Sequence, residues 1–538
     1  MVTGIKSDRT AGGDEVSVPD QAGYQPSWYT ATAVPRPERA PLTADHDVDV
    51  CVIGAGLAGL TTAREIARSG WSVAVLEAGR IAWNASGQNC GFVLPGYGAG
   101  IDTIVKRVGL RRAKDLWALS EAGLEYVRAT IRETRMPGVD PIDGWLNVSK
   151  LDDADRIVGI LQLLANDLGA EVEGWATDRV RDVLKSERYF NAIHFPRAFH
   201  LHPLNYALGL AAAAEQAGAH IFEGTPAVAI DPAGVRKRIE TPHGRLRAAH
   251  VVLAGNVHIG ALMPRIAATL LPIWTYLATT APLGPRLSDA ITYYGAVSDS
   301  EVADNHYRIV DGDRLLISGR ATMWEADPGR FAGALAADIA KLYPQLGAVE
   351  IEHRWSGVLG RTIHGVPQIG ELSPGIWLAS GFGGHGLNTT AMAGNLIARA
   401  IVDGDDSWRL FLPFELIWSG GRIGRAAAQV GYWWRRRRDE INAQKARARA
   451  TGAAEATPTR RRPARVQNES SDRAVAPKPS SRAASAAAME LPAVELPDDP
   501  RPDPLPLRMA EPPGFDDDQP ASGQPLSRSA TTARRSSR

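Results

Sequence analysis

The sequence contains only two cysteines, Cys51 and Cys90, among its 538 residues. With so few thiols a framework of several disulfides is excluded, and no C-x-x-C motif is present to support disulfide-reductase chemistry. This cysteine usage is typical of a reducing compartment, so we predict a cytoplasmic location. Cys51 lies inside an apolar run, where we expect it to act as a small buried hydrophobe.

Long apolar runs and an excess of one charge are also missing. No run of about 18 uninterrupted apolar residues occurs, so no membrane-spanning helix is predicted. Residues 1–16 lack the apolar core of a secretory signal. The 60 lysines and arginines balance the 60 aspartates and glutamates, which gives no indication of a nucleic-acid or membrane partner. A composition that is 44% hydrophobic and 22% charged is typical of a globular enzyme.

What the chain does contain is a glycine-punctuated stretch at residues 48–77. It opens with a mostly apolar, β-branched run that is typical of a buried parallel strand. Gly54, Gly56 and Gly59 follow in G-x-G-x-x-G spacing, and a helical pattern and a second apolar strand come next. The stretch closes on Glu77, eighteen residues after the last glycine.

Each of these residues suits a dinucleotide. Gly54 permits the tight turn out of the strand, Gly56 lets a pyrophosphate approach the backbone, and Gly59 lets the helix pack closely on the strand. The helix N-terminus offers free N–H groups to the phosphates, and Glu77 suits the ribose hydroxyls. We therefore predict a dinucleotide site. The alternative is a tight strand-to-helix turn that binds no ligand.

A second segment, residues 85–91 (ASGQNCG), is small, polar and too irregular for a strand. It is either an ordinary surface loop or a loop that crosses the cofactor's pyrophosphate and flanks its reactive ring. We favour the second interpretation.

A third segment, residues 381–386 (GFGGHG), lies between a predicted strand at 375–380 and a predicted helix at 389–402. It formally repeats G-x-G-x-x-G and could mark a second nucleotide site for NAD(P)H. However, no third strand with a terminal acid follows, so the pattern of a βαβ unit is incomplete. We favour a helix N-terminus that points at the redox ring of the same cofactor, where its positive end would stabilise the anionic reduced ring.

The remaining pattern predicts an α/β protein with a separate antiparallel layer, because residues 268–320 are rich in β-branched and aromatic residues with intervening turns. Helices are predicted at 102–136, 151–169, 204–217 and 331–342, and strands at 144–148, 219–223, 227–230, 249–254 and 349–355. Residues 1–26 and the low-complexity tail 440–538 are predicted to be disordered. The tail's basic and acidic runs leave open that it binds a polyanion or a protein partner.

Taken in order, the motifs resemble the FAD-dependent amine and amino-acid oxidases of the glycine/D-amino-acid oxidase (DAO) family, and within it the gamma-glutamylputrescine oxidase subgroup. The resemblance covers residues 27–439 and rests on SWYTATA, VCVIGAGLAGL, ASGQNCG, HLHPLNYALGLA, FEGTPAVAI, HYRIVDGDRLLISG, WSGVLGRTIHGVPQIGEL and GFGGHGLNTTAMAGNLIA. It implies a Rossmann-like (glutathione-reductase-like) FAD-binding domain with an inserted α+β substrate domain that contains an antiparallel sheet. The FAD-binding segments would be 47–100, 200–265 and 350–405, and the substrate domain 101–199 and 266–349.

The resemblance also implies FAD, bound non-covalently in an extended pose. Glu77 would face the adenosine ribose, Val228 would contact the adenine through its backbone, and His385 would cap the pyrimidine end. His385 is also the one catalytic candidate. The residues predicted to contact FAD are Gly54, Ala55, Gly56, Leu57, Ala58, Gly59, Glu77, Ala78, Ser86, Gly87, Asn89, Cys90, Gly91, Val228, Ala254, Gly255, Gly360, Gly381, Gly384, His385, Gly386 and Leu387.

Departures from the family pattern bear on the substrate. Gln88 and Cys90 replace the Arg and Gly of the subgroup's S-G-R-N-G-G loop. Where the sarcosine-oxidase branch carries cations for a substrate carboxylate, this chain has Cys90, Val93 and Asn388, none of which forms a bidentate charge-assisted pair. We therefore expect an amine without a carboxylate beside the reacting carbon. A covalent flavin link through Cys90 is the other reading of that residue, although the branches with such links place them elsewhere.

The expected reaction is hydride transfer from the carbon of a CH–NH or CH–NH2 group to flavin, which oxygen or another acceptor then reoxidises. A small-molecule amine is therefore the expected partner. Two alternatives remain open: a D-amino-acid dehydrogenase or oxidase that uses another electron acceptor, and a partner-binding protein that acts through its tail. His200, His202 and His364 are not spaced as metal ligands, so no metal is predicted, and no nucleic-acid partner is indicated.

Overall fold

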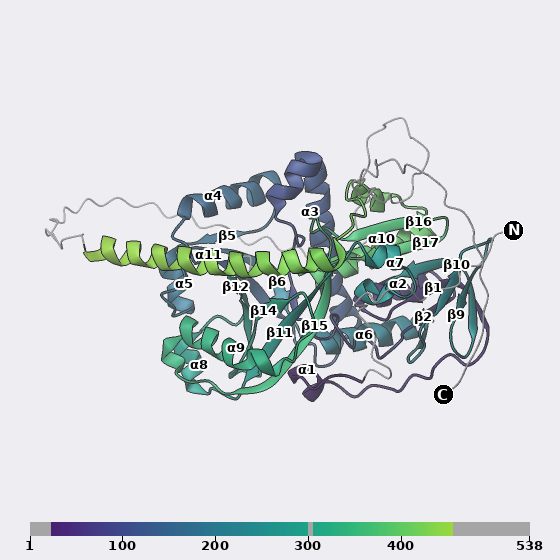
Figure 1. The fold of residues 1–538 in the computed structure, drawn as a ribbon, viewed down its shortest axis with the longest axis horizontal. Coiled ribbons are helices and arrows are strands. Elements are labelled where there is room, and N and C mark those ends of the chain that lie inside the picture. Colours follow the sequence, from purple (N-terminus) through teal and green to yellow (C-terminus); the bar gives the residue numbers. More distant parts are fainter. Residues whose placement is uncertain (1–22, 300–304, 456–538) are drawn as a thin grey trace, which may run out of the picture.

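The computed structural model describes residues 23–299 and 305–455 of the chain, which are organised around two sheets (Figure 1). Residues 1–22 and 456–538, which make up most of the two segments predicted to be disordered, lie outside the described residues. In the described part of the chain, no helix is both long and apolar enough to cross a membrane, and no cluster of His, Cys, Asp and Glu is arranged to hold a metal ion.

The first sheet has a parallel centre, as the sequence predicted. Strands β17, β10, β1, β2 and β7 run parallel in that order, β16 lies antiparallel on β17, and the hairpin β8–β9 extends β10. The bounds are β1 (His46–Ile53), β2 (Val73–Leu76), β7 (His220–Phe222), β8 (Ala229–Asp231), β9 (Lys237–Glu240), β10 (Arg245–Leu253), β16 (Gln368–Ser373) and β17 (Ile376–Ser380). Cys51 is fully buried in β1, the central strand, as predicted.

The second sheet is the predicted antiparallel layer. Its strands follow the order β15-β11-β14-β13-β12-β4-β6-β3, with β5 added on β6, and only β12 and β4 pair in parallel among the described pairs. The bounds are β3 (Phe92–Val93), β4 (Ile142–Val148), β5 (Glu173–Trp175), β6 (Ala192–His200), β11 (Leu271–Thr280), β12 (Ala296–Asp299), β13 (His306–Val310), β14 (Arg314–Thr322) and β15 (Ile351–Arg361). Strands from distant parts of the chain therefore alternate within one layer, which confirms an α/β protein with mixed sheets.

The helices cover and connect the two sheets (Figure 1). Their bounds are α1 (Trp28–Ala31), α2 (Leu57–Arg68), α3 (Ile101–Thr134), α4 (Ala154–Gln162), α5 (Thr177–Val183), α6 (Pro203–Gln216), α7 (Pro264–Ala267), α8 (Pro285–Ala290), α9 (Gly329–Leu342), α10 (Gly386–Val402) and α11 (Gly421–Glu455). Short 3-10 or π turns stand at Leu163–Asp167, Asn256–Ile259, Pro344–Leu346 and Ser407–Phe411. Helix α10 packs on α2 and α3, and α2 also packs on α6.

The helix α11 crosses the boundary at 439 that the sequence predicted for the folded unit. It continues as helix to Glu455, because one of its faces is buried against the rest of the protein. Gln429, Tyr432, Asp439 and Ala443 are all less than 10% exposed and recur at helical spacing. The run of four arginines at 435–438 masks this period in the sequence.

Helices α10 and α2 pack closely against each other at Gly394 of α10. A Cβ atom at this position would lie 2.6 Å from the Cβ of Thr61 on α2. Because real Cβ atoms do not approach so closely, only glycine lets these two helices keep their separation.

We therefore expect Gly394→Ala to lower the free energy of unfolding by about 1–3 kcal/mol through overpacking. The measurement is urea unfolding followed by circular dichroism. Gly333→Ala is the matched control, since a Cβ there, on α9, meets nothing within 4 Å. That variant should be neutral or stabilising by up to about 1 kcal/mol. Equal effects of the two substitutions would contradict the close approach of α10 and α2.

Candidate functional site

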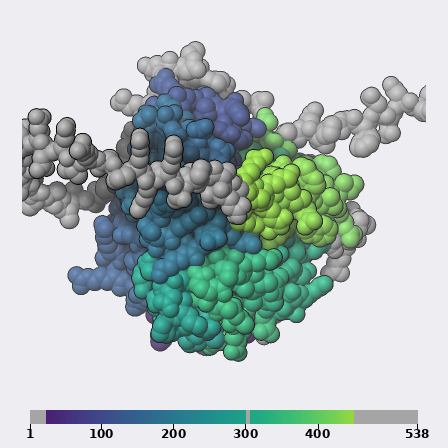
Figure 2. Space-filling view, turned by 90° about the vertical axis from the view of Figure 1, so that its left-hand side faces the viewer, coloured from purple at the N-terminus to yellow at the C-terminus, as the bar shows by residue number. Residues whose placement is uncertain are grey.

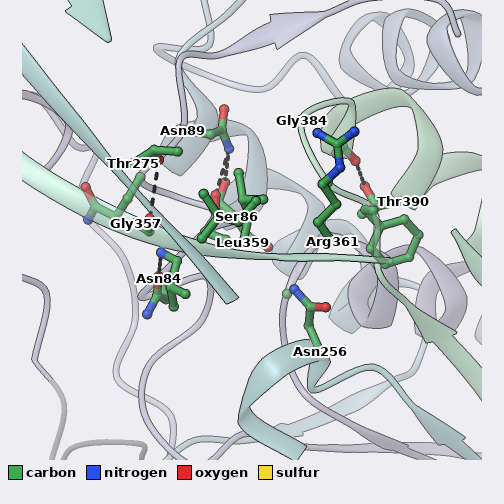
Figure 3. A pocket seen from close by; sticks show the side chains of 18 of the residues that line it. Asn84, Ser86, Asn89, Asn256, Thr275, Gly357, Leu359, Arg361, Gly384 and Thr390 are labelled. Carbon is green, nitrogen blue, oxygen red and sulfur yellow. Dashed lines mark hydrogen bonds between the residues drawn. The ribbon is translucent and has the colours of Figure 1, made fainter. Parts of the chain in front are cut away.

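A cavity of about 1230 Å³ lies where the two sheets meet. One side is the carboxyl edge of the first sheet, where β1, β2 and β10 end, and the facing side carries residues of β11, β14 and β15 (Figure 3). Open α/β sheets bind their ligands outside the carboxyl ends of the strands. The volume exceeds the roughly 300–1,000 Å³ that is usual for small ligands, so the cavity has room for a dinucleotide together with a substrate.

The turn from β1 into α2 is shaped for close approach. Gly54 has a φ of +108°, and a Cβ there would lie 2.8 Å from the carbonyl oxygen of Ala254. A Cβ on Gly59 would lie 2.0 Å from the carbonyl oxygen of Gly54, so the helix could not pack on the turn with any larger residue. Gly56, Leu57 and Ala58 at the start of α2 line the cavity. The helix N-terminus therefore faces the place predicted for the pyrophosphate.

Glu77, at the end of β2, lines the cavity but is nearly fully buried. Its Oε2 accepts a hydrogen bond from the Ala55 amide at 2.7 Å, and its Oε1 accepts one from the Gly79 amide at 2.8 Å. Burial raises the pKa of this carboxyl to about 7, against the lowering effect of the two amides. Glu77 thus holds the glycine turn in shape, a role the sequence did not indicate, and its remaining lone pairs are available to ribose hydroxyls.

The loop 85–91 is part of the cavity wall and not a free surface loop. Ser86 Oγ accepts the amide of Leu57 at 3.1 Å, which joins the loop to the start of α2. Asn89 fastens the loop to itself, since its Nδ2 donates to the carbonyl of Ser86 at 2.9 Å and its Oδ1 accepts the amide of Gly91. The neighbouring Asn84, which the sequence did not single out, accepts the Val358 amide at 2.9 Å and joins the loop to β15 (Figure 3).

Gln88 is the residue of this loop whose buried polar side chain lacks hydrogen-bond partners in the described part of the chain. Its side chain is fully buried and lines the cavity, yet neither its Oε1 nor its Nε2 has a hydrogen-bond partner among the described residues. A buried amide without partners is costly, so a ligand with polar edges is expected beside it.

The start of α10 forms another part of the wall. Gly384, His385, Gly386 and Leu387 all line the cavity, and His385 is the N-cap of the helix. Burial, with the positive charge of Arg361, lowers the pKa of His385 to about 4. The imidazole is therefore neutral at physiological pH and too weak a base to take a proton from an alkylammonium group. No strand follows α10 in the described part of the chain, in agreement with a single dinucleotide site.

Val228 lines the cavity at the hairpin end and is 55% exposed. Its amide already donates to the carbonyl of Glu240 at 2.8 Å, so only its own carbonyl is free for the predicted adenine contact. Ala78, Ala254 and Gly255 also line the cavity beyond the ends of β2 and β10.

Six of the residues predicted to contact FAD lie behind the wall and do not line the cavity. These are Ala55, Gly59, Gly87, Gly91, Gly360 and Gly381. Most of them serve close packing: a Cβ on Gly360 would lie 2.4 Å from Asn256 Oδ1, and a Cβ on Gly381 would lie 2.5 Å from a methyl group of Thr362. Their contact with the cofactor stays a prediction.

Several lining residues come from the second sheet and from α11, and sequence patterns did not indicate them. Aromatic and polar side chains of the second sheet provide Trp145, Asn147, Ser298, His306 and Ser318, and α11 provides Ala427, Ala428, Gly431, Tyr432 and Arg435. Strand alternation predicts which side chains share a face, but only the folded order of strands places these faces beside the dinucleotide.

The three positions at which the sequence lacks an expected cation, Cys90, Val93 and Asn388, differ in where they lie relative to the cavity. Cys90 lines the cavity, and burial raises the pKa of its thiol to about 11, which leaves it protonated and unreactive. Val93 and Asn388 are buried and do not line the cavity. Cations nevertheless reach the cavity wall from other segments of the chain, namely Arg320, Arg361 and Arg435.

Together these features fit the FAD that the sequence predicted. A glycine turn that any Cβ would fill and the start of α2 suit the pyrophosphate, and Glu77 suits the ribose. The unpartnered amide of Gln88 and the start of α10 suit the polar edge of a flavin ring.

Comparison with known proteins agrees with this geometry. Residues 49–400 match the family model described as FAD dependent oxidoreductase (DAO). The chain is 31% identical over 396 residues to the gamma-glutamylputrescine oxidoreductase of Escherichia coli K12, which covers 70% of this chain and 88% of that protein. It is 30% identical over 403 residues to the probable oxidoreductase OrdL of Haemophilus influenzae, covering 73% of this chain and 92% of that protein.

Solved structures share the fold at lower identity. Glycine oxidase from Geobacillus kaustophilus superposes with a TM-score of 0.57 and 22% identity, over 66% of this chain and 95% of that one. L-proline dehydrogenase from P. horikoshii gives a TM-score of 0.58 and 18% identity, over 69% of this chain and 98% of that one.

The glycine turn yields a direct test of cofactor binding. We expect Gly56→Val to abolish FAD binding, because a branched side chain would meet Ser86 Oγ, which lies 2.9 Å from a Cβ there, and would fill the path of the pyrophosphate. The measurement is FAD content from the absorption spectrum of the purified protein. Gly159→Val on α4, where a Cβ meets nothing within 4 Å, is the control and should keep its FAD. Full FAD content in Gly56→Val would contradict this placement.

Proposed function

This chain belongs to the DAO family of FAD-dependent oxidoreductases, and we propose that it oxidises an amine whose reacting carbon carries no carboxylate. The cavity that joins the dinucleotide turn of the first sheet to an aromatic and polar wall of the second carries this proposal. Bound FAD supplies the hydride acceptor, and the oxidised product is an imine that water hydrolyses to a carbonyl compound. Oxygen is the proposed final electron acceptor.

The protein's first task is to hold the cofactor and exclude water. The starts of α2 and α10 both open on the cavity, so two positive helix ends are available to a ligand with negative groups. Phe92 and Trp145 give the substrate end apolar walls, and Trp145 is fixed because its Nε1 donates to Ser298 Oγ at 3.0 Å. Fixed walls of this kind orient a substrate chain against the reacting atoms.

The charge of the cavity favours the reactive form of an amine. An alkylammonium must lose a proton before its nitrogen lone pair can assist hydride transfer, and burial in a cavity with few carboxylates lowers the pKa of such a group. The wall offers little negative charge to stabilise the ammonium form, because Glu77 is the one carboxylate that lines the cavity in the described part of the chain. The cavity therefore favours the neutral amine without a dedicated base.

The choice of substrate rests on two observations. The chain is similar to a gamma-glutamylputrescine oxidoreductase over 70% of its length. Cys90, Val93 and Asn388 also offer no cation at the places where the amino-acid-oxidising branch binds a carboxylate next to the reacting carbon. Both favour an amine of the polyamine type, or its gamma-glutamyl conjugate, over an α-amino acid.

A second candidate is a D-amino-acid dehydrogenase or oxidase with another electron acceptor. Its support is the presence of arginines in the cavity wall, which could hold an amino-acid carboxylate. The chain is also 24% identical over 393 residues to the glycine oxidase of Geobacillus kaustophilus. Release of hydrogen peroxide with an amine would favour the first candidate. Reduction without peroxide would favour the second.

A function carried by the tail is the remaining alternative, and residues 456–538 lie outside the described part of the chain. A chain that ends at Glu455 keeps α11 and the whole cavity wall. If the flavin unit is the functional part, the amine should reduce the FAD bound to the truncated protein as fast as it reduces the FAD bound to the full-length protein.

The substrate prediction is tested by flavin bleaching under anaerobic conditions. We expect putrescine-type amines or their gamma-glutamyl conjugates to reduce the bound FAD at least ten times faster than sarcosine, glycine or D-alanine. The reason is that an unpaired carboxylate in the pocket costs several kcal/mol, on the order of one uncompensated buried ion. The wild-type protein without substrate and free FAD with substrate are the controls. If the small amino acids reduce the FAD faster than every amine, the proposed substrate class is wrong.

A further inference from the structure

Two arginines in the cavity wall have no acidic partner in the described part of the chain. Arg361 is the last residue of β15, and Arg435 lies on α11. A third lining arginine, Arg320, differs because it forms an ion pair with Asp338. Arg361 and Arg435 thus present uncompensated positive charge to the cavity.

Arg361 stands at the α10 end of the cavity. Its backbone forms a bridge with Phe382, the second residue of the glycine-rich loop before α10. Its side chain points toward Gly384 (Figure 3), and its Nη2 donates to the carbonyl of Gly98 at 3.3 Å. One weak bond to a carbonyl leaves most of the five N–H donors of this guanidinium available to a ligand.

Arg435 lies on α11, and hydrogen bonds fix this helix to β14 on both sides of Arg435. Tyr432 Oη accepts the amide of Ala321 at 3.2 Å, and Arg436 Nη1 donates to the carbonyl of Gly319 at 2.8 Å. Arg435 itself lines the cavity, and its Nε is buried with no hydrogen-bond partner among the described residues. The donor is therefore held in place before any ligand arrives.

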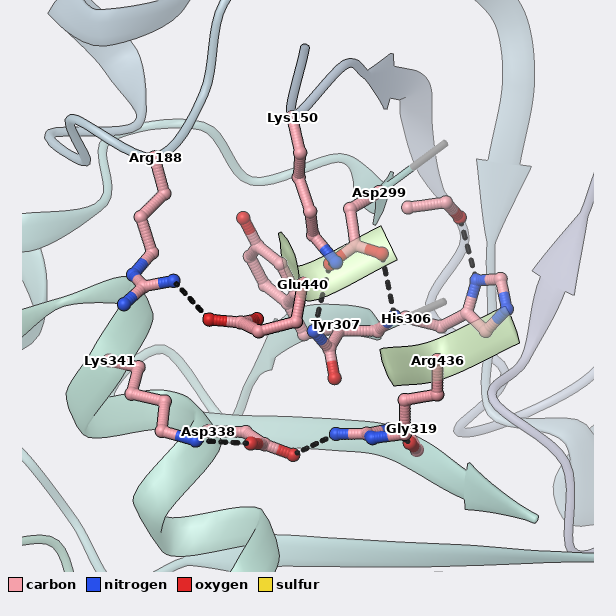
Figure 4. A network of polar contacts seen from close by, with 12 residues as sticks. Lys150, Arg188, Asp299, His306, Tyr307, Gly319, Asp338, Lys341, Arg436 and Glu440 are labelled. Atoms are coloured by element: carbon pink, nitrogen blue, oxygen red, sulfur yellow. Dashed lines mark hydrogen bonds and ion pairs between the residues drawn. The ribbon is translucent and has the colours of Figure 1, made fainter. Parts of the chain in front are cut away.

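A polar network strengthens this attachment of α11 (Figure 4). Asp338 on α9 accepts Arg436 Nη2 at 3.2 Å, and Arg188 lies 3.8 Å from Glu440 further along the helix. Figure 2 shows the other face of α11 exposed at the surface, at the yellow-green end of the colour scale, above teal and green residues on the side where Figure 1 labels α8 and α9. The helix thus closes one side of the cavity with a fixed position.

The electrostatics of the pair call for an anion. Burial and the charge of Arg435 both lower the pKa of Arg361, as expected for neighbouring cations that lack a counter-charge. Glu77 does not serve as the counter-charge, because the amides of Ala55 and Gly79 hold its carboxylate at the end of β2 and it forms no ion pair with either arginine among the described residues. A cleft lined by one sign of charge concentrates ligands of the opposite sign.

We propose that Arg361 and Arg435 form a carboxylate-binding subsite, which holds an acidic group that the amine substrate carries away from its reacting carbon. This inference rests on the proposed function and deepens it. The planar forks of two arginines match the oxygens of a carboxylate. Arg435 lies beyond residues 49–400, the part that matches the family, so α11 supplies a specificity element from outside the family core.

The cofactor is a poorer occupant of this subsite than the substrate. The phosphates of FAD are expected at the start of α2, where the glycine turn leaves room for them. A site that only binds FAD would also not need α11, because this helix lies beyond the residues that match the family. The experiment nevertheless separates the two occupants.

The test compares Arg361→Gln and Arg435→Gln with Arg437→Gln, an exposed arginine on the same helix that does not line the cavity. Each holoenzyme is assayed with a diamine and with its gamma-glutamyl conjugate, which adds a distal carboxylate. For the conjugate we expect KM to rise about 10- to 100-fold in the first two variants, the range for a lost charge-assisted hydrogen bond. Its kcat, the KM for the diamine, and the FAD content, spectrum and potential should not change. Arg437→Gln should resemble wild type.

Other outcomes would overturn the subsite. A shift of FAD content, spectrum or potential in either variant would assign the arginines to the cofactor. Equal losses with both substrates would assign them a general structural role, and no change with either would remove them from binding altogether.

A second arm does not depend on turnover. Glutarate, titrated into the wild-type holoenzyme, should perturb the absorption of bound FAD, and Arg361→Gln and Arg435→Gln should each weaken its binding about 10-fold or more. If no amine reduces the FAD but glutarate still binds through both arginines, the proposed function fails and the anion subsite stands. If amines are oxidised but glutarate binds equally to all variants, the subsite fails and the function stands.

Discussion

The structure depends on the close approach of backbone to backbone at the start of α2. Glycine at 54 and 59 lets the turn, the helix and the end of β10 meet within distances that no Cβ tolerates. Glu77 then locks this turn by accepting the amide of Ala55, while its other oxygen accepts the amide of Gly79 from the segment after β2. Everything that the cavity does with a dinucleotide follows from this small, rigid and side-chain-free surface, which presents backbone N–H groups to a ligand.

A second close contact extends that constraint to the far end of the cofactor. Gly394 lets α10 lie directly against α2, so the N-termini of both helices open on one cavity. The two helix ends are more than 300 residues apart in the chain, and their separation in space is set by this packing. A change in the helix interface would therefore alter both ends of the binding site together.

The substrate side of the cavity is built from different elements. Its wall combines the antiparallel sheet with α11, and the charges there are supplied by residues from separate segments. Arg320 forms an ion pair with Asp338, whereas Arg361 and Arg435 have no acidic partner among the described residues. The dinucleotide side thus lies within the residues that match the family, while the carboxylate subsite that we propose also draws on a helix beyond them.

The sequence by itself determined the local features of this protein. The parallel strands, the glycine turn, Glu77 and the start of α10 all follow from patterns within short windows, because steric and hydrogen-bonding rules act between near neighbours. Tertiary structure alone decided which side chains of the second sheet face the cavity, that Gln88 is buried without a partner among the described residues, and that Arg361 and Arg435 line the same cavity. It also showed that the basic run at 435–438 belongs to a half-buried helix. These outcomes depend on contacts between distant segments, which local periodicity does not encode.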